Sequence, residues 1–121
     1  MSTDDYERRT REAAAAAITK GHSDSANLRE LLIWTTSTAT EPMVAAYFAQ
    51  HLQDEALLDA LFSIAAEGED MGDAPWAAAN VIANFPASLL ARHRPELVSL
   101  ASEQWDYLNQ PAKRALAKLD Q

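Results

Sequence analysis

Three neighbouring side chains could carry out acid–base or metal chemistry: His51, Asp54 and Glu55. An imidazole beside two carboxylates can ligate a metal ion or transfer protons. The spacing is not that of the HExxH zinc motif, and we expect a helix boundary to separate the histidine from the two acids. The chain also has no cysteine, P-loop, GxSxG or dinucleotide-binding glycine pattern. We therefore expect no catalytic residue, no metal and no cofactor, and an enzyme that uses these three residues is our third hypothesis.

The densest group of acids lies in residues 67–73, EGEDMGD. Carboxylates on a tight loop with glycines can bind a hard cation such as Ca²⁺. The positions do not match an EF-hand loop, which has more alternating acids and a glutamate at its twelfth position. We interpret the segment as a solvated turn between helices in which Asp73 caps the helix that follows.

The charge of the chain is unevenly distributed. The formal net charge is −8, and residues 30–91 contain nine acids and no lysine or arginine. A surface of this kind repels the phosphates of nucleic acids and of anionic membranes. It attracts a basic protein by long-range steering. We therefore expect a basic protein partner, no nucleic acid and no membrane; the alternative is an acidity that serves solubility alone.

The composition and the short helix-breaking segments predict an all-α fold in a single domain, residues 1–121. Helix-forming residues dominate, and there are only 3 glycines. Residues 4–39 are predicted as an N-terminal helical hairpin. Its first helix stops at Gly21, and its second begins after Asn27, which we interpret as a cap with Glu30 at the third helical position.

The rest of the chain repeats one helix-start pattern, in which a capping residue stands two places before a proline. The three copies are Thr40-Glu-Pro42, Asp73-Ala-Pro75 and Asn109-Gln-Pro111. A period of 30 to 40 residues with two helices in each unit is typical of an α-solenoid. The predicted units are residues 40–72, residues 73–108 and a terminal half-repeat, residues 109–121, whose single helix has no partner. The alternative is an irregular bundle in which the prolines recur by chance.

These units resemble HEAT repeats and their armadillo-like relatives over about residues 41–121. The stretch LNQPAKRALAKL is similar to the family's aspartate-proline, valine-arginine and alanine-leucine pattern. Asn109 and Pro111 stand near the aspartate-proline, and Arg114 stands at the arginine. Ala45 and Ala78 hold the arginine position in the other two units. The resemblance implies a small α-α superhelix that binds a protein or, less often, a nucleic acid.

Two polar faces are candidates for contact with a partner. The polar residues of the second helices are Glu55, Asp59, Ser63, Glu96, Ser99 and Glu103, which would line the concave side if the family geometry holds. The first helices carry a second stripe, formed by Tyr47, His51, Asn80 and Asn84, which is either a solvated face or a contact surface. Trp34 is a further candidate because partly exposed tryptophans are common hot spots.

The sequence therefore favours a non-catalytic protein–protein interaction module. Its most concrete form is a small acidic inhibitor, or immunity-type protein, that binds a basic partner. The alternative is a regulatory or assembly adaptor that self-associates through its C-terminal helix. The N-terminal residues lack the apolar core of a signal peptide, and no apolar run has the length of a membrane span, so we expect a cytoplasmic protein.

Overall fold

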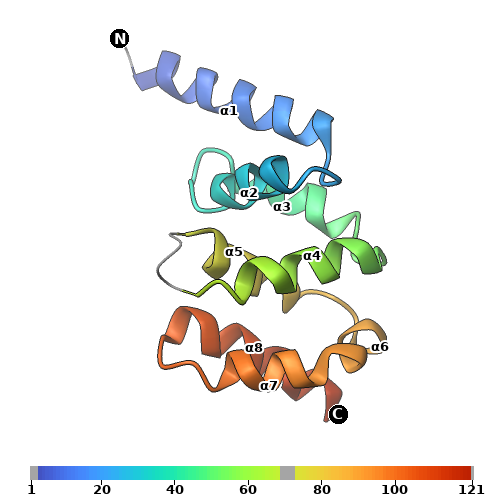
Figure 1. The fold of residues 1–121 in the computed structure, drawn as a ribbon. Helices are drawn as coiled ribbons and strands as arrows, with labels where there is room; N and C mark the ends of the chain where they lie inside the picture. The colour runs from blue at the N-terminus through green and yellow to red at the C-terminus, as the bar shows by residue number, and fades with distance from the viewer. Residues whose placement is uncertain (1–2, 69–72, 121) are drawn as a thin grey trace. The chain divides into compact units, whose positions relative to one another are not determined.

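The computed structural model describes residues 3–68 and 73–120 (Figure 1). Every regular element in these two ranges is a helix, which confirms the predicted all-α class. The chain divides into two compact units, Met1–Gln50 and His51–Gln121, where the sequence analysis expects one domain. Within the described ranges, no helix combines the length and the apolar character that crossing a bilayer requires. Most of the acidic segment 67–73 lies outside the described residues.

The first unit contains three helices that contact one another. They are α1 (Thr3–Lys20), α2 (Ser25–Trp34) and α3 (Glu41–Ala49). Small side chains of α1, Ala14 and Ala17, are buried with large apolar residues of the other two helices. The large residues are Leu28, Leu31, Leu32, Val44 and Phe48. As predicted, α1 stops before Gly21, whose φ of 82° is costly for any residue with a Cβ atom.

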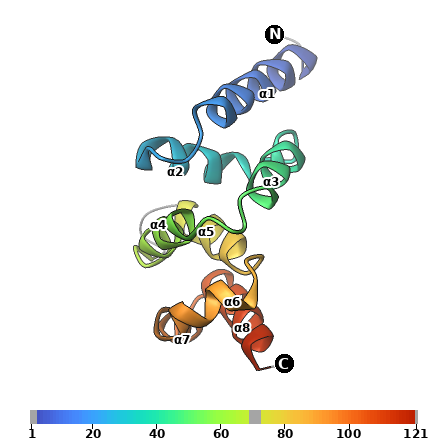
Figure 2. The same ribbon diagram turned by 90° about the vertical axis from the view of Figure 1, so that its right-hand side faces the viewer.

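The second unit has two layers of helices. Its elements are α4 (Glu55–Ala65), α5 (Ala74–Ile82), α6 (Ala87–Leu90), the short 3₁₀ helix η2 (Ala91–His93), α7 (Arg94–Ala101) and α8 (Asp106–Leu119). Contacts pair α4 with α5, α7 with α8, and α5 with α8. In Figures 1 and 2, α4 and α7 form one layer and α5 and α8 form the other. The fully buried core between them includes Leu58, Leu61, Ile82, Phe85, Leu97 and Leu108.

Two of the three predicted proline-associated helix starts agree with the structure. Thr40 and Asp73 precede α3 and α5 directly, although neither side chain makes a capping hydrogen bond. The third is wrong: α8 begins at Asp106, so Pro111 lies inside the helix. The expectation of an unpaired last helix is also corrected, because α8 packs against both α7 and α5.

The predicted cap at Asn27 is wrong for a related reason. Asp24 occupies the N-cap position of α2, and its Oδ1 accepts a hydrogen bond from the amide of Ala26 at 3.1 Å. Asn27 lies inside the helix, where it is only 6% exposed. Its Nδ2 donates to the carbonyl oxygens of Ala17 at 2.8 Å and Gly21 at 2.5 Å. Asn27 therefore satisfies the carbonyl end of the preceding helix instead of starting its own.

A hydrogen bond of the same kind, from a buried side chain to an earlier backbone carbonyl, closes two other turns. The Oγ1 of Thr40 donates to the carbonyl of Trp34 at 2.6 Å, and the Nδ2 of Asn109 donates to the carbonyl of Glu103 at 2.8 Å. In each case, as for Asn27 and Gly21, the buried side chain reaches a carbonyl six residues earlier. Buried polar groups need such partners because desolvation without a hydrogen bond is costly.

Side-chain hydrogen bonds between helices of the second unit span about one repeat length. The guanidinium of Arg114 donates to Oδ1 of Asn80, 34 residues earlier, at 3.2 Å. The Nζ of Lys118 donates to the carbonyl of Ala83 at 2.5 Å and to that of Phe85 at 3.1 Å, which are 35 and 33 residues earlier. Lys118 thus places a positive charge at the C-terminal end of α5, where the helix dipole is negative.

Replacing Lys118 by methionine should lower the free energy of unfolding by about 1–2 kcal/mol, because two carbonyls lose a charged donor. Lys113 is the matched control, since it lies exposed on the same helix, and Lys113→Met should change stability by less than about 0.5 kcal/mol. Urea denaturation followed by circular dichroism measures both variants. Equal stability losses would show that the Lys118 contacts are not stabilising.

Candidate functional site

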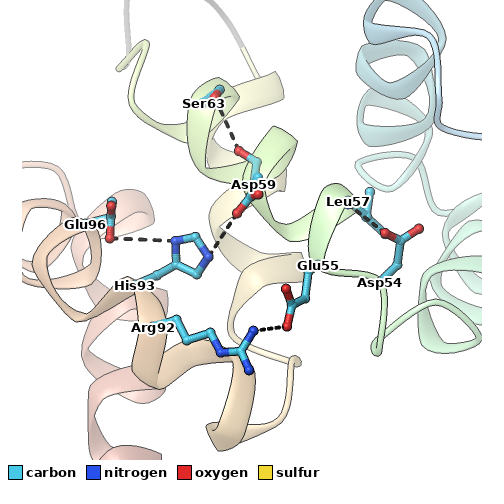
Figure 3. Close-up of polar contacts among 8 residues, drawn as sticks. All are labelled: Asp54, Glu55, Leu57, Asp59, Ser63, Arg92, His93 and Glu96. Carbon is cyan, nitrogen blue, oxygen red and sulfur yellow. Dashed lines mark hydrogen bonds and ion pairs between the residues drawn. The ribbon is translucent and has the colours of Figure 1, made fainter.

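The candidate site is a surface of the second unit on the layer formed by α4 and α7, which we call the acidic face. Its members are Glu55, Asp59, Ser63, Glu96, Ser99 and Glu103, and all six are exposed. Figure 3 shows α4 and the η2–α7 segment side by side, with their polar side chains directed toward one another. The same six residues were predicted to form the polar side of the second helices, which is wrong for Glu103, because α7 ends at Ala101 and Glu103 lies in the turn that follows.

Helix spacing explains why α4 presents these residues. Glu55, Asp59 and Ser63 follow one another at intervals of four, so they share one side of the helix. Leucines at positions 57, 58 and 61 occupy the opposite side and are buried. Asp54 is the N-cap of α4, and its Oδ1 accepts a hydrogen bond from the amide of Leu57 at 3.0 Å. The cap therefore fixes where the row formed by Glu55, Asp59 and Ser63 begins, which we call the acidic stripe.

His93 lies at the centre of the acidic face. Its Nε2 is 3.0 Å from Oδ1 of Asp59, which is a hydrogen-bonding distance, and its Nδ1 is 3.7 Å from Oε2 of Glu96. The imidazole is stacked on the ring of Phe62, with centroids 4.6 Å apart and planes 21° from parallel. The side chain is only 19% exposed, whereas those of Asp59 and Glu96 are 66% and 52% exposed. Packing therefore holds the imidazole in place between two solvated carboxylates.

A second basic side chain engages the beginning of the acidic stripe. The guanidinium of Arg92 forms an ion pair with Glu55 (Figure 3). Both side chains are more than half exposed, at 65% and 52%, so water screens the pair and its contribution to stability is small. Basic residues of the same unit therefore already contact three of the carboxylates of the acidic face, those of Glu55, Asp59 and Glu96.

These contacts leave the second unit strongly negative. It carries eleven acidic and five basic residues, so its formal charge is −6 of the total −8. Glu103 is exposed, and within residues 3–68 and 73–120 its carboxylate has no ion-pair partner. Ser63 and Ser99 add exposed hydroxyl groups beside the carboxylates. The face can therefore bind additional cationic groups and hydrogen-bond donors.

The structure gives separate roles to the acids of the enzyme hypothesis. Asp54 is turned toward the amide of Leu57, whereas Glu55 points toward Arg92 on another side of α4 (Figure 3). His51 is half-buried, and its backbone carbonyl accepts a hydrogen bond from the amide of Asp54 at 3.1 Å. The two carboxylates thus have structural partners, and catalysis by this group stays an untested prediction.

The secondary stripe is divided between the two units. In the first unit, the hydroxyl of Tyr47 lies 2.6 Å from Nδ1 of His22 in a hydrogen bond. In the second unit, the amide of Asn80 is held on both sides, because Nδ2 donates to the carbonyl of Trp76 at 3.2 Å while Oδ1 accepts from Arg114. Asn84 is exposed. Two of the four side chains in this stripe, those of Tyr47 and Asn80, are therefore engaged in internal hydrogen bonds.

Trp34 belongs to the first unit and is not part of the acidic face. It is half-buried at the end of α2, and its carbonyl accepts the hydrogen bond from Thr40. Its indole Nε1 is buried without a hydrogen-bond partner among the described residues. The side chain therefore offers little polar surface for the predicted contact.

Sequence reasoning missed Arg92 and His93 as members of the site. They stand in a three-residue 3₁₀ helix that periodicity does not reveal. One signal could have found them: Arg92 follows Glu55 by 37 residues, close to the repeat period of 33 to 36 that separates the proline triplets. In a repeat fold, residues one period apart lie on neighbouring units.

Comparison with family models, with curated proteins and with solved structures found no match to this chain.

Proposed function

We propose that this protein is a non-catalytic binding module whose acidic face holds a basic segment of a partner protein. One observation carries the proposal: carboxylates from two helices converge on one surface and already contact basic groups, as Asp59 and Glu96 do on either side of His93. A partner's arginine or lysine side chains would form charge-assisted contacts with such carboxylates, as Arg92 does with Glu55.

The charge of the second unit supports the same partner class. A formal charge of −6 on one compact unit attracts cationic proteins from a distance and raises their association rate. Binding should therefore weaken as salt is added, because the Debye length falls from about 10 Å at 0.1 M to about 3 Å at 1 M.

We propose a HEAT-like arrangement for the second unit as the scaffold of this surface. The two helix layers and the side-chain contacts between residues 33 to 37 positions apart support it. In such a fold, α4 and α7 would be the helices that line the binding side, and both contribute carboxylates to the acidic face. The family itself stays a proposal that rests on the resemblance of the repeat units.

The most concrete version is a small inhibitor, or immunity-type protein, that covers the basic surface of its partner. Its compact size and the net acidity of the chain support this version. An assembly adaptor that self-associates through its C-terminal helix is the alternative. We rank it second, because α8 already packs against both α5 and α7 and therefore has less free surface for self-association.

The test is the affinity for a labelled hexa-arginine peptide, measured by fluorescence anisotropy at low salt. Asp59→Asn combined with Glu96→Gln should weaken binding about fivefold to tenfold, since each exposed charge contributes up to about 1 kcal/mol. The control is Glu12→Gln combined with Glu30→Gln, which makes the same change in net charge at exposed positions of the first unit. Equal weakening by the two double variants would contradict a localised face. Circular dichroism verifies that each variant is folded.

A further inference from the structure

We infer that Arg92 is a built-in competitor for the cationic partner, because its guanidinium occupies the carboxylate of Glu55 that a partner's guanidinium would bind. The inference rests on the proposed function, since it concerns the regulation of that same face. It assigns the two basic residues of η2 different tasks: one holds the surface in shape, and the other occupies part of it until a partner arrives.

The two residues differ in how firmly they are held. His93 is mostly buried and stacked on Phe62, so it stays in place as part of the surface. The side chain of Arg92 is 65% exposed, and its only ion pair among the described residues is the one with Glu55. A long exposed side chain gains little from such a pair. Arg92 can therefore leave Glu55 at low cost when a stronger ligand arrives.

Arg92 and a partner's arginine compete for Glu55 because both present a guanidinium group. A guanidinium fits a carboxylate with planar, forked donors, and a partner's arginine would present the same group to the same oxygens. Nη1 of Arg92 contacts Oε1 of Glu55, so a partner's guanidinium that binds both oxygens of this carboxylate in the bidentate mode has to displace Arg92 from Oε1. While Arg92 is in place, it also adds one positive charge beside the acidic stripe, which repels the partner.

The other charged groups near η2 do not take over this role. Asp59 on α4 and Glu96 on α7 both face His93. Arg94, the first residue of α7, lies 3.6 Å from Asp120, at the end of α8. Arg94 is thus two residues from Arg92, has the same charge and is 49% exposed against 65% for Arg92, but it pairs with a carboxylate outside the acidic face. This makes it a close control.

The experiment compares Arg92→Gln with Arg94→Gln in the hexa-arginine binding assay. Both variants change the net charge by the same amount, so long-range attraction rises equally in the two. Arg92→Gln should bind the peptide about threefold to fivefold more tightly than Arg94→Gln, because only the former frees Glu55. Equal affinities of the two variants would overturn the inference.

A double-mutant comparison tests the mechanism directly. Adding Glu55→Gln to Arg92→Gln should weaken peptide binding about threefold, because the freed carboxylate is then the one that the peptide uses. Adding Glu55→Gln to Arg94→Gln should have a smaller effect, since Arg92 still occupies that position. If Glu55→Gln has the same effect in both backgrounds, Arg92 does not compete.

The peptide assay distinguishes the competitor role of Arg92 from the binding role of the acidic face. If the peptide binds the wild-type protein and depends on Asp59 and Glu96, but Arg92→Gln and Arg94→Gln bind alike, only the competitor is excluded. If the Asp59→Asn and Glu96→Gln changes leave the affinity for the peptide unaltered, the proposed function is wrong, and the competition has no basis.

Discussion

Replacing Asn27 by alanine is expected to lower the free energy of unfolding by about 2–3 kcal/mol. The Nδ2 of Asn27 donates to two carbonyls at the end of α1, and the side chain is only 6% exposed. Alanine would remove the donor, which leaves the carbonyl of Gly21 without this hydrogen bond and that of Ala17 with only the amide of Gly21, 3.2 Å away, to offset its desolvation. Urea denaturation followed by circular dichroism measures the loss.

Asn84 provides the control for this change. It is exposed on the surface of the second unit, so Asn84→Ala should alter stability by less than about 0.5 kcal/mol. If Asn27→Ala is no more destabilising than this control, the buried amide does not stabilise the turn between α1 and α2. Asn109→Ala should behave like Asn27→Ala, because it removes the equivalent bond to the carbonyl of Glu103.

Truncating Phe62 to alanine is expected to cost about 3–4 kcal/mol of stability, the largest effect of any change considered. The side chain is 6% exposed, so alanine would leave a cavity in the second unit. Phe62→Leu fills most of that volume and should cost about 1–1.5 kcal/mol. Thermal and urea unfolding of the two variants measure these differences.

Phe62 also links the core to the acidic face. The ring supports the imidazole of His93, which in turn lies between Asp59 and Glu96. Phe62→Leu should therefore leave the protein folded but weaken hexa-arginine binding about twofold to threefold, since His93 loses the surface that fixes its position. A folded leucine variant with unchanged affinity would show that the placement of His93 does not matter for the face.

Local sequence rules predict a helix start correctly where the side chain of the capping residue accepts a hydrogen bond from the first turn. Asp54 is the clear case, since its carboxylate accepts a hydrogen bond inside the first turn of α4. The rules fail at Asn27 and Asn109, because an asparagine amide can donate backward to a carbonyl as readily as its oxygen can accept a capping bond. Burial decides between the two uses, and burial depends on packing that a local pattern does not contain.

Local patterns also predict only part of the candidate site. Four-residue spacing identifies Glu55, Asp59 and Ser63 as one exposed side of a helix, and the structure agrees. The basic side chains that reach them, Arg92 and His93, come from a short 3₁₀ helix with no periodic signal. Their positions follow from how the α6–α7 segment lies beside α4, which is a tertiary property.

The most direct test of the acidic face is an isotope-edited NMR titration of the full chain with the hexa-arginine peptide. If the acidic face binds the peptide, the largest amide shift changes should fall on residues 55–63 and 92–103 and should diminish as salt is raised. The α5–α8 layer, residues 74–82 and 110–118, should change little. Shift changes that are spread evenly over the chain, or that gather on the α5–α8 layer, would show that the peptide does not bind the acidic face.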